Sequence, residues 1–316
     1  EALVSKGIGY VSPEDIGRAK RIDDGRYRYI ERVKSSFPNQ MRLDGLKVVI
    51  DCANGAGYKA APEVLWELGA EVIPVGVSPD GRNINLECGS TSPTVAAETV
   101  VAHGADLAIC LDGDADRVLI IDEYGRPIDG DQFLGMIGSR WFKNGNLVEN
   151  TLVSTVMSNM RLEAFLKQEG IKLVRTSVGD RYVVERMRLN GFNLGGEKSG
   201  HVVMMDYATT GDGLMAGLQF LAEMVRTGEV ASVVGRPFDL APQKTENITY
   251  AGDKNPLDHP SIKKIISEAE KKISGFGRLL VRKSGTEKLI RIMVEAEDAS
   301  VIDATMSPVV AAIKEL

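Results

Sequence analysis

Residues 107–117 read Leu-Ala-Ile-Cys-Leu-Asp-Gly-Asp-Ala-Asp-Arg, so five apolar residues lead directly into an acidic loop. The apolar run is typical of a buried strand. Upstream, the pattern predicts strands over 47–51 and 72–77, and helices over 58–68 and 94–103 that each end at a glycine. This alternation of strands and helices predicts an α/β domain with a mainly parallel sheet.

The same order of elements recurs between residues 151 and 201. The pattern predicts strands over 151–156, 172–178 and 192–194, and helices over 159–169 and 180–189. The last strand again runs into a polar loop, Gly195–His201. Ligands of open α/β sheets bind beyond the carboxyl ends of strands, so both polar loops are candidate binding loops.

The fold class is therefore expected to be α/β, with two tandem α/β domains with mainly parallel mixed sheets and a smaller C-terminal α+β domain. The third domain follows from a different order after residue 236, with a helix over 262–273, strands over 278–281 and 289–295, and a C-terminal helix. We expect domains over 25–128, 129–235 and 236–316 after an N-terminal segment, 1–24. Helical spacing is also present over 15–36.

The composition excludes several classes of protein. A net charge of −6 argues against a general binder of nucleic acid or of membrane surfaces, so we expect neither partner. No apolar run approaches the roughly 18 residues that span a bilayer. Cys52 and Cys110 lie in apolar runs, Cys88 is distant in sequence, and no C-x-x-C is present. This pattern indicates free thiols in a reducing cytoplasm.

Three carboxylates alternate along the acidic loop: Asp112, Asp114 and Asp116. They would repel one another unless a cation neutralised them, and oxygen ligands suit Mg²⁺ or Ca²⁺. Arg117 would then face a phosphate that completes the coordination. A solvated acidic turn is the alternative. An EF-hand loop would need glycine at position 117, and a haloacid-dehalogenase-type loop would need Thr or Val at position 116.

The loop Gly196–His201 has the donors and acceptors for a sugar. Glu197 can accept hydrogen bonds from two neighbouring hydroxyls, and Ser199 can both donate and accept. His201 could move a proton near neutral pH, and a structural histidine is the alternative.

A third polar loop, Arg282–Glu287, is followed by Arg291. Two guanidiniums, the hydroxyls of Ser284 and Thr286, and N–H groups freed by Gly285 predict a phosphate cradle. A hairpin turn with surface charges is the alternative. Metal, polyol and phosphate loops in one chain indicate phosphoryl transfer to or from a phosphorylated sugar.

A fourth segment, Gly179-Asp180-Arg181, begins a predicted helix. Its backbone N–H groups could face a ligand. Asp180 as a helix cap is the alternative.

The order and spacing of these loops resemble the α-D-phosphohexomutase superfamily over essentially the whole chain. Segments 46–57, 194–201 and 208–213 are most similar to its bacterial glucosamine-phosphate branch. The resemblance implies a cytoplasmic isomerase, an intramolecular phosphotransferase of amino-sugar and peptidoglycan precursor synthesis. It would convert glucosamine 6-phosphate to glucosamine 1-phosphate through a phosphoserine and glucosamine 1,6-bisphosphate.

The resemblance also implies roles for individual residues. One Mg²⁺ per chain would be held by Asp112, Asp114 and Asp116, while Arg117 and His201 would be catalytic. The phosphorylated hexosamine would be bound by a larger set from three segments: Gly179, Asp180, Arg181, Glu197, Ser199, Arg282, Ser284, Gly285, Thr286 and Arg291.

One family segment has no counterpart in this sequence. The superfamily's nucleophilic serine lies in a T-[AS]-S-H-N-P-like segment of its first domain, and no Ser here is followed by His-Asn-Pro. We therefore interpret 1–24 as the tail of that domain and a linker, and expect the chain alone to bind substrate without turnover. The surface that a first domain would cover suggests self-association, and a native homodimer is an alternative.

Three functional alternatives remain open at this point. The first is a phosphomannomutase/phosphoglucomutase, and the second is a non-catalytic sugar-phosphate-binding fragment. The third is a Mg²⁺-dependent phosphatase with Asp112 as its nucleophile.

Overall fold

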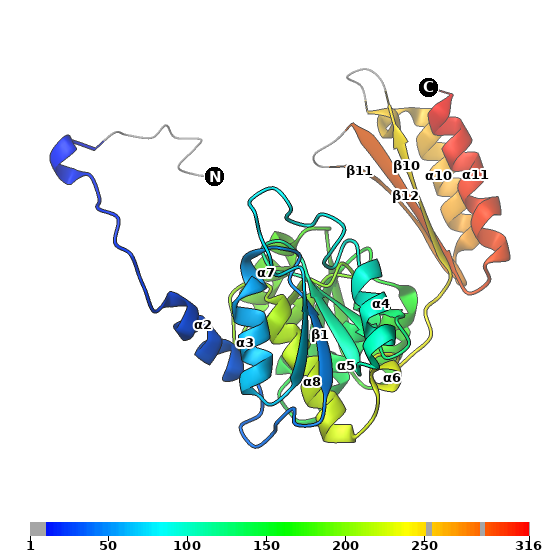
Figure 1. Ribbon diagram of the computed structural model, residues 1–316. Helices are drawn as coiled ribbons and strands as arrows, with labels where there is room; N and C mark the ends of the chain where they lie inside the picture. The colour runs from blue at the N-terminus through cyan, green and yellow to red at the C-terminus, as the bar shows by residue number, and fades with distance from the viewer. Residues whose placement is uncertain (1–10, 251–254, 285–287, 316) are drawn as a thin grey trace.

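The computed structural model describes residues 11–250, 255–284 and 288–315. Figure 1 shows an α/β body, a smaller C-terminal unit beside it and an N-terminal segment that extends away from the body. In the part of the chain described, no helix is both long and apolar enough to cross a membrane. Cys52, Cys88 and Cys110 are buried free thiols.

The first sheet has the strand order β2-β1-β3-β4-β5. Its strands are β1 (Lys47–Asp51), β2 (Glu71–Val75), β3 (Leu107–Leu111), β4 (Val118–Asp122) and β5 (Pro127–Ile128). The helices of this part are α2 (Gly25–Lys34), α3 (Ala60–Glu67) and α4 (Thr94–His103). β1 pairs in parallel with β2 and β3, and β3 pairs antiparallel with β4. The acidic loop therefore joins β3 to β4 at the carboxyl end of a fully buried strand.

The second sheet repeats this topology in the order β7-β6-β8-β9. Its strands are β6 (Thr151–Thr155), β7 (Lys172–Thr176), β8 (Leu194–Gly196) and β9 (Val202–Met204). Its helices are α5 (Gly130–Lys143), α6 (Met160–Gln168), α7 (Asp180–Asn190), α8 (Gly213–Thr227) and α9 (Ala231–Val234). β6 is parallel to β7 and β8, whereas β9 is antiparallel to β8. The tandem α/β architecture with mainly parallel sheets is thus confirmed.

One hydrophobic core runs through both halves of the body. α8 packs on β3 so closely that a Cβ on Gly217 would lie 3.0 Å from the Ile109 side chain. Phe133 of α5 and Phe220 of α8 pack edge to face, with ring centroids 5.8 Å apart. The two sheets are therefore held in a fixed relation by buried apolar contacts.

The C-terminal unit is the predicted α+β domain. Its antiparallel sheet has the order β10-β12-β11, and its helices are α10 (Pro260–Ile273) and α11 (Ser300–Lys314). The strands are β10 (Gln243–Thr249), β11 (Gly277–Lys283) and β12 (Leu289–Ala296). The unit has its own apolar core between sheet and helices. Figure 1 shows the sheet on the side toward the body and the two helices on the outer side.

Two sequence interpretations differ from the structure. The helix predicted over 15–36 is wrong in its first half, because only α2 is helical there apart from a short 3₁₀ turn at Pro13–Asp15. Residues 11–24 are exposed, whereas Ile30 and Val33 of α2 are buried, and burial decides which turns are stable. Helix α5 was not predicted, although Phe133, Leu134, Ile137 and Trp141 recur at helical spacing. In the structure residues 131–141 are all buried.

Asp131 in the first turn of α5 is fully buried. Its Oδ2 accepts a hydrogen bond from the backbone N–H of Asn159 at 2.7 Å, and its Oδ1 has no hydrogen-bond partner among the described residues. Burial is the main cause that raises the pKa of Asp131 from 3.8 to about 6. The folded state therefore binds this proton more tightly than the unfolded chain does.

Because the folded pKa is raised, the stability from this group is present below pH 4 and is lost as pH rises through 6. We compare the free energy of unfolding of Asp131→Asn with that of the wild type at pH 4 and at pH 8. The difference, variant minus wild type, should be about 2–3 kcal/mol more favourable to the variant at pH 8 than at pH 4. Urea unfolding at both pH values measures this difference, with exposed Glu98→Gln as the control. A difference that does not change with pH would contradict the prediction.

Candidate functional site

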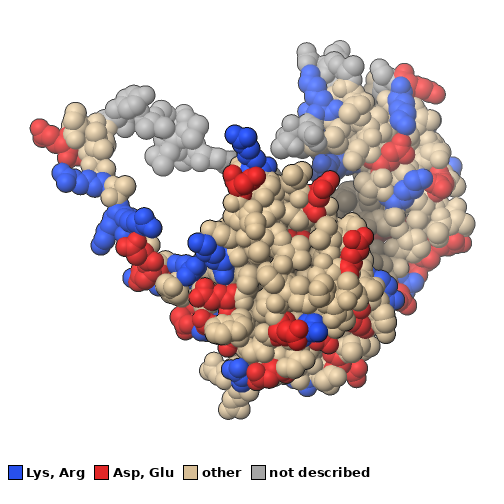
Figure 2. Space-filling view, viewed as in Figure 1, with Lys and Arg blue, Asp and Glu red and all other residues tan. Residues whose placement is uncertain are grey.

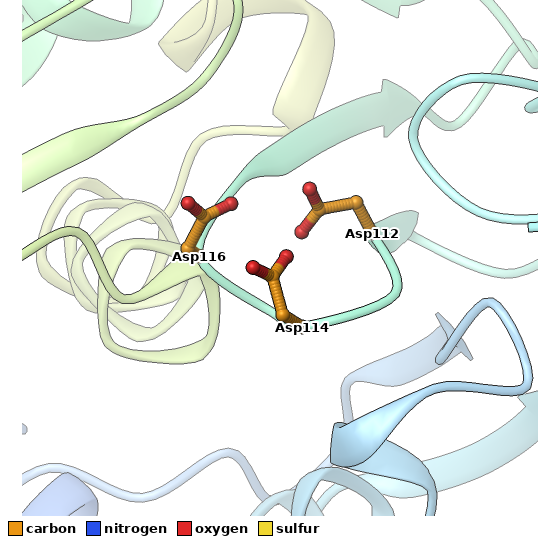
Figure 3. A group of neighbouring side chains, drawn as sticks. All are labelled: Asp112, Asp114 and Asp116. Carbon is orange, nitrogen blue, oxygen red and sulfur yellow. The ribbon is translucent and has the colours of Figure 1, made fainter. Parts of the chain in front are cut away.

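The acidic loop brings three carboxylates together beyond the end of β3 (Figure 3). One oxygen of each of Asp112, Asp114 and Asp116 lies within 4.8 Å of the others. Asp112 is buried, Asp116 is half-buried and Asp114 is exposed. The turn passes through Ala115 at φ 62°, in the left-handed region. The backbone of the loop therefore aims all three side chains at one point.

The loop after β1 supports this turn from one side. A Cβ on Gly55 would lie 2.2 Å from the carbonyl oxygen of Gly113, so no side chain fits between the two loops. The N–H of Ala56 donates to the same carbonyl at 2.8 Å. The turn is thus fixed by backbone contacts as well as by its own sequence.

Charge in this loop is incompletely balanced. Nε of Arg117 donates to Oδ2 of Asp112 at 2.6 Å, and its backbone N–H donates to Oδ1 at 3.1 Å. Burial and the charge of Asp112 raise the pKa of Asp116. Oδ1 of Asp116 is buried without a hydrogen-bond partner among the described residues. One guanidinium facing three carboxylates leaves a donor set that fits a divalent cation. Strands β3 and β4 flank the loop, which excludes an EF-hand.

The loop Gly196–His201 lies directly beside the acidic loop. Arg117 and His201 form an antiparallel β-bridge, and the N–H of Val118 donates to the carbonyl of Gly200 at 3.1 Å. Nδ1 of His201 lies 3.2 Å from Oδ2 of Asp116. His201 is buried, and its Nε2 has no hydrogen-bond partner among the described residues. The structure therefore joins two loops that are far apart in sequence.

Glu197 is oriented by the neighbouring helix. Its Oε1 accepts a hydrogen bond from the N–H of Gly179 at 3.0 Å. Its own N–H donates to the carbonyl of His201 at 2.9 Å, which closes the loop. Gly179 has φ 129° and is the cap residue that precedes α7. The turn Gly179–Arg181 is thus connected by a hydrogen bond to the loop Gly196–His201, the sugar-loop candidate.

The remaining predicted residues of these two segments lie at their outer surface. Ser199 and Asp180 are exposed. Asp180 is the first residue of α7, and no side-chain capping bond is present at that helix end, so the capping alternative is not supported. The guanidinium of Arg181 lies over the ring of Tyr182, 4.8 Å from its centroid.

Arg282 and Arg291 face each other across the β11–β12 ladder. Nε of each is buried without a hydrogen-bond partner among the described residues. Burial and the charge of Arg291 lower the pKa of Arg282, and the carboxylate of Glu197 opposes this shift. Two like charges in register are unfavourable, and an anion between them would relieve the repulsion. The influence of the Glu197 carboxylate on the pKa of Arg282 indicates that Arg282 lies on the side of its unit toward the body.

Ser284 directly follows β11 and is buried, with its N–H donating to the carbonyl of Leu289 at 2.8 Å. Gly285 and Thr286, which the sequence also assigns to the phosphate cradle, lie outside the described residues. Figure 2 shows the hollow between the body and the C-terminal unit, with acidic and basic side chains interspersed on this face.

Comparison with known proteins assigns the chain to a family. Residues 27–125 match "Phosphoglucomutase/phosphomannomutase, alpha/beta/alpha domain II", residues 129–238 match domain III, and residues 245–312 match the C-terminal domain. The phosphoglucosamine mutase of Roseobacter denitrificans is 62% identical over 315 residues, which is 100% of this chain and 70% of that protein. The chain belongs to the phosphoglucomutase/phosphomannomutase family.

Other relatives agree with this assignment. The phosphoglucosamine mutase of a Ruegeria species is 62% identical and covers 99% of this chain and 70% of its own length. A phosphoglucomutase/phosphomannomutase family protein from Burkholderia thailandensis has the same fold, with a TM-score of 0.76 and 20% identity. The match covers 94% of this chain and 65% of that protein. The N-acetylphosphoglucosamine mutase of Aspergillus fumigatus, solved with GlcNAc-6P and magnesium, gives a TM-score of 0.73 and 20% identity. This match covers 94% of this chain and 67% of that protein.

Some residues around the site of this phosphoglucomutase/phosphomannomutase family member were not found from sequence. Lys198 lies inside the sugar-loop candidate, and its side chain contacts Asp129 and Gln243. Nothing in the local sequence indicates those two partners. Its position between Glu197 and Ser199 was the one available signal.

We expect Asp114→Asn to weaken binding of Mn²⁺, used as a probe for Mg²⁺, by about tenfold or more, because one charged oxygen ligand is lost. Asp114 is exposed, so the midpoint of thermal unfolding should not change. Electron paramagnetic resonance of free Mn²⁺ measures the affinity, and exposed Glu270→Gln is the matched control. Equal affinities in the wild type and Asp114→Asn would exclude the triad as a metal site.

Proposed function

We propose that this chain forms the metal-, sugar- and phosphate-binding part of a phosphoglucosamine mutase. The observation that carries the proposal is the packing of the sugar loop against the acidic loop, with Nδ1 of His201 3.2 Å from Oδ2 of Asp116. The Lys198–Gln243 hydrogen bond connects the same loop to the C-terminal unit that bears Arg282. The high identity to proteins named phosphoglucosamine mutase supports glucosamine phosphate as the sugar.

In this proposal Asp112, Asp114 and Asp116 hold one Mg²⁺. Oδ1 of Asp116 supports this role, because it is buried without a hydrogen bond to any described residue and lies 3.4 Å from Nε of Arg117, which also serves Asp112. The ion would neutralise charge on the phosphoryl oxygens during transfer. Arg117, fixed against Asp112, would present its remaining N–H groups to the same phosphoryl group.

The sugar would be held by the loop between β8 and β9. Glu197 keeps acceptor capacity for sugar hydroxyls although one oxygen is engaged by Gly179. Ser199 is exposed and can donate or accept at the rim. His201 would hold or move a proton at Nε2, the nitrogen without a partner in the described residues. Gly179, Asp180 and Arg181 would extend this surface.

The second phosphate would be gripped by the C-terminal unit. Arg282 and Arg291 supply paired guanidiniums, and Ser284, Gly285 and Thr286 add hydroxyl and backbone donors. A cradle that recognises phosphate without reading the sugar can hold either end of glucosamine 1,6-bisphosphate. The intermediate could then turn around between the two transfer steps.

The proposed reaction has two phosphoryl-transfer steps. A phosphoserine gives its phosphoryl group to O1 of glucosamine 6-phosphate, which produces the bisphosphate and a free serine hydroxyl. That hydroxyl then takes the phosphoryl group from O6 and leaves glucosamine 1-phosphate. The family segment with this serine has no match in the sequence, and the chain spans 70% of the length of its curated relatives. This transfer is therefore proposed for the whole protein.

We expect Arg282→Ala to weaken glucosamine 6-phosphate binding by about tenfold or more, because a charge-assisted bidentate contact is lost. Lys283→Ala is the matched control, since its side chain alternates to the other face of the same strand. Isothermal titration calorimetry in Mg²⁺ measures both affinities. An equal loss of affinity in the two variants would show that Arg282 contributes only a general positive charge and no specific phosphate contact.

A second prediction concerns the sugar. We expect the chain to bind glucosamine 6-phosphate more tightly than glucose 6-phosphate or mannose 6-phosphate. Competition titrations followed by phosphorus NMR give the order and also report chemistry. A preference for a neutral sugar would favour phosphomannomutase/phosphoglucomutase, and release of inorganic phosphate would favour the phosphatase alternative.

A further inference from the structure

Lys198 connects the sugar loop to the C-terminal unit. Its Nζ donates to Oε1 of Gln243 at 2.7 Å and lies 3.3 Å from Oδ2 of Asp129. Gln243 is the first residue of β10, and Asp129 caps α5. The side chain of Lys198 is 32% exposed, so this is a partly buried, charge-assisted contact.

The backbone of Lys198 is also confined. A Cβ on Gly130 would lie 2.2 Å from the carbonyl oxygen of Lys198, so the loop rests directly on the start of α5. The loop cannot shift toward α5. The same lysine therefore has a fixed backbone and a side chain that reaches the next structural unit.

Gln243 belongs to a sheet row that leads to the phosphate cradle. Gln243 pairs with Glu295 of β12, and Glu295 pairs with Arg278 of β11. The pair Leu280–Met293 lies two residues further along the β11–β12 ladder than Arg278–Glu295. The pair Arg282–Arg291 lies four residues further along. Side chains two apart on a strand share a face, so both ends of this row lie on one face of the sheet.

Other described contacts between the body and this unit involve the start of α6, and they include an ion pair between Arg161 and Glu297. The carbonyl of Ser158 accepts a hydrogen bond from Arg278. The side chain of Asn159 exchanges two hydrogen bonds with the backbone of Ala241, at 3.0 and 3.1 Å. These contacts attach the C-terminal unit to the start of α6, whereas Lys198 attaches it to the loop that would hold the sugar.

We propose that Lys198 is a positioning residue that sets the distance between the sugar loop and the Arg282–Arg291 pair. The inference rests on the proposed function, because it concerns how one sugar phosphate contacts both places. Glu197 and Ser199 flank Lys198, and Gln243 passes its position to the arginine pair through the sheet. A ligand with a sugar and a phosphate needs this spacing, whereas inorganic phosphate needs the arginine pair alone.

The first test compares two ligands by calorimetry in Mg²⁺. Lys198→Met should weaken glucosamine 6-phosphate binding by about tenfold, and inorganic phosphate binding should stay within about twofold. Lys198→Arg keeps the charge and the donors, so it should restore most of the affinity. Exposed Lys172→Met, on β7, is the matched control.

The second test needs no ligand. Spin labels at Lys167→Cys on α6 and Lys271→Cys on α10 report the distance between the two units, and the three native cysteines are buried. Lys198→Met should broaden this distance distribution, and Gln243→Leu should broaden it to the same extent. The double variant should add nothing, because both changes remove one contact.

The outcomes separate the two proposals. If the wild type binds glucosamine 6-phosphate and Lys198→Met changes neither affinity nor distribution, the inference is overturned and the proposed function stands. If Lys198→Met weakens both ligands equally, the spacing role is also overturned. If the wild type does not bind the sugar phosphate, the proposed function fails. The positioning role of Lys198 is then overturned as well if Lys198→Met leaves the spin-label distance distribution unchanged.

Discussion

The backbone pairing between the acidic loop and the sugar loop is the contact on which the rest of the site depends. It consists of the hydrogen bond from Val118 to Gly200 and the bridge between Arg117 and His201. Gly200 has φ 88°, and a Cβ there would lie 2.0 Å from the carbonyl of Val118. A residue with a side chain would force the two loops apart. The shared core would still hold the two sheets together, but the carboxylates and the proposed sugar-binding groups would no longer lie side by side.

Charge is arranged in two unmatched clusters on either side of this pairing. The acidic triad has one guanidinium for three carboxylates, and the arginine pair places two guanidiniums in register. Each cluster carries repulsion that a ligand of opposite sign would relieve, a cation in one case and a phosphate in the other. A phosphorylated sugar with a metal ion is complementary to both at once. The proposed function would account in this way for the buried polar atoms that have no hydrogen bond in the described part of the chain, such as Oδ1 of Asp116 and Nε of Arg282 and Arg291.

Much of the fold follows from the sequence, because buried strands such as 107–111 are recognisable as continuous apolar runs. Helix α5 was not predicted, although its apolar residues Phe133, Ile137 and Trp141 recur at helical spacing. The segment before α2 shows the reverse error: helical spacing is present, but residues 11–24 bury nothing in the described structure. The acidic triad was predictable because its three ligands lie within five residues. The Lys198–Gln243 contact was not, because its partners are brought together by tertiary packing alone.

The central claim is that the three loops act on one ligand. A crystal structure of the chain with Mn²⁺ and glucosamine 6-phosphate tests it most directly, because anomalous scattering locates the manganese independently of the sugar. The account predicts manganese among Asp112, Asp114 and Asp116, the sugar against Glu197, and the phosphate between Arg282 and Arg291. Manganese at another place, or a sugar phosphate that contacts one loop and leaves the arginine pair free, would contradict it.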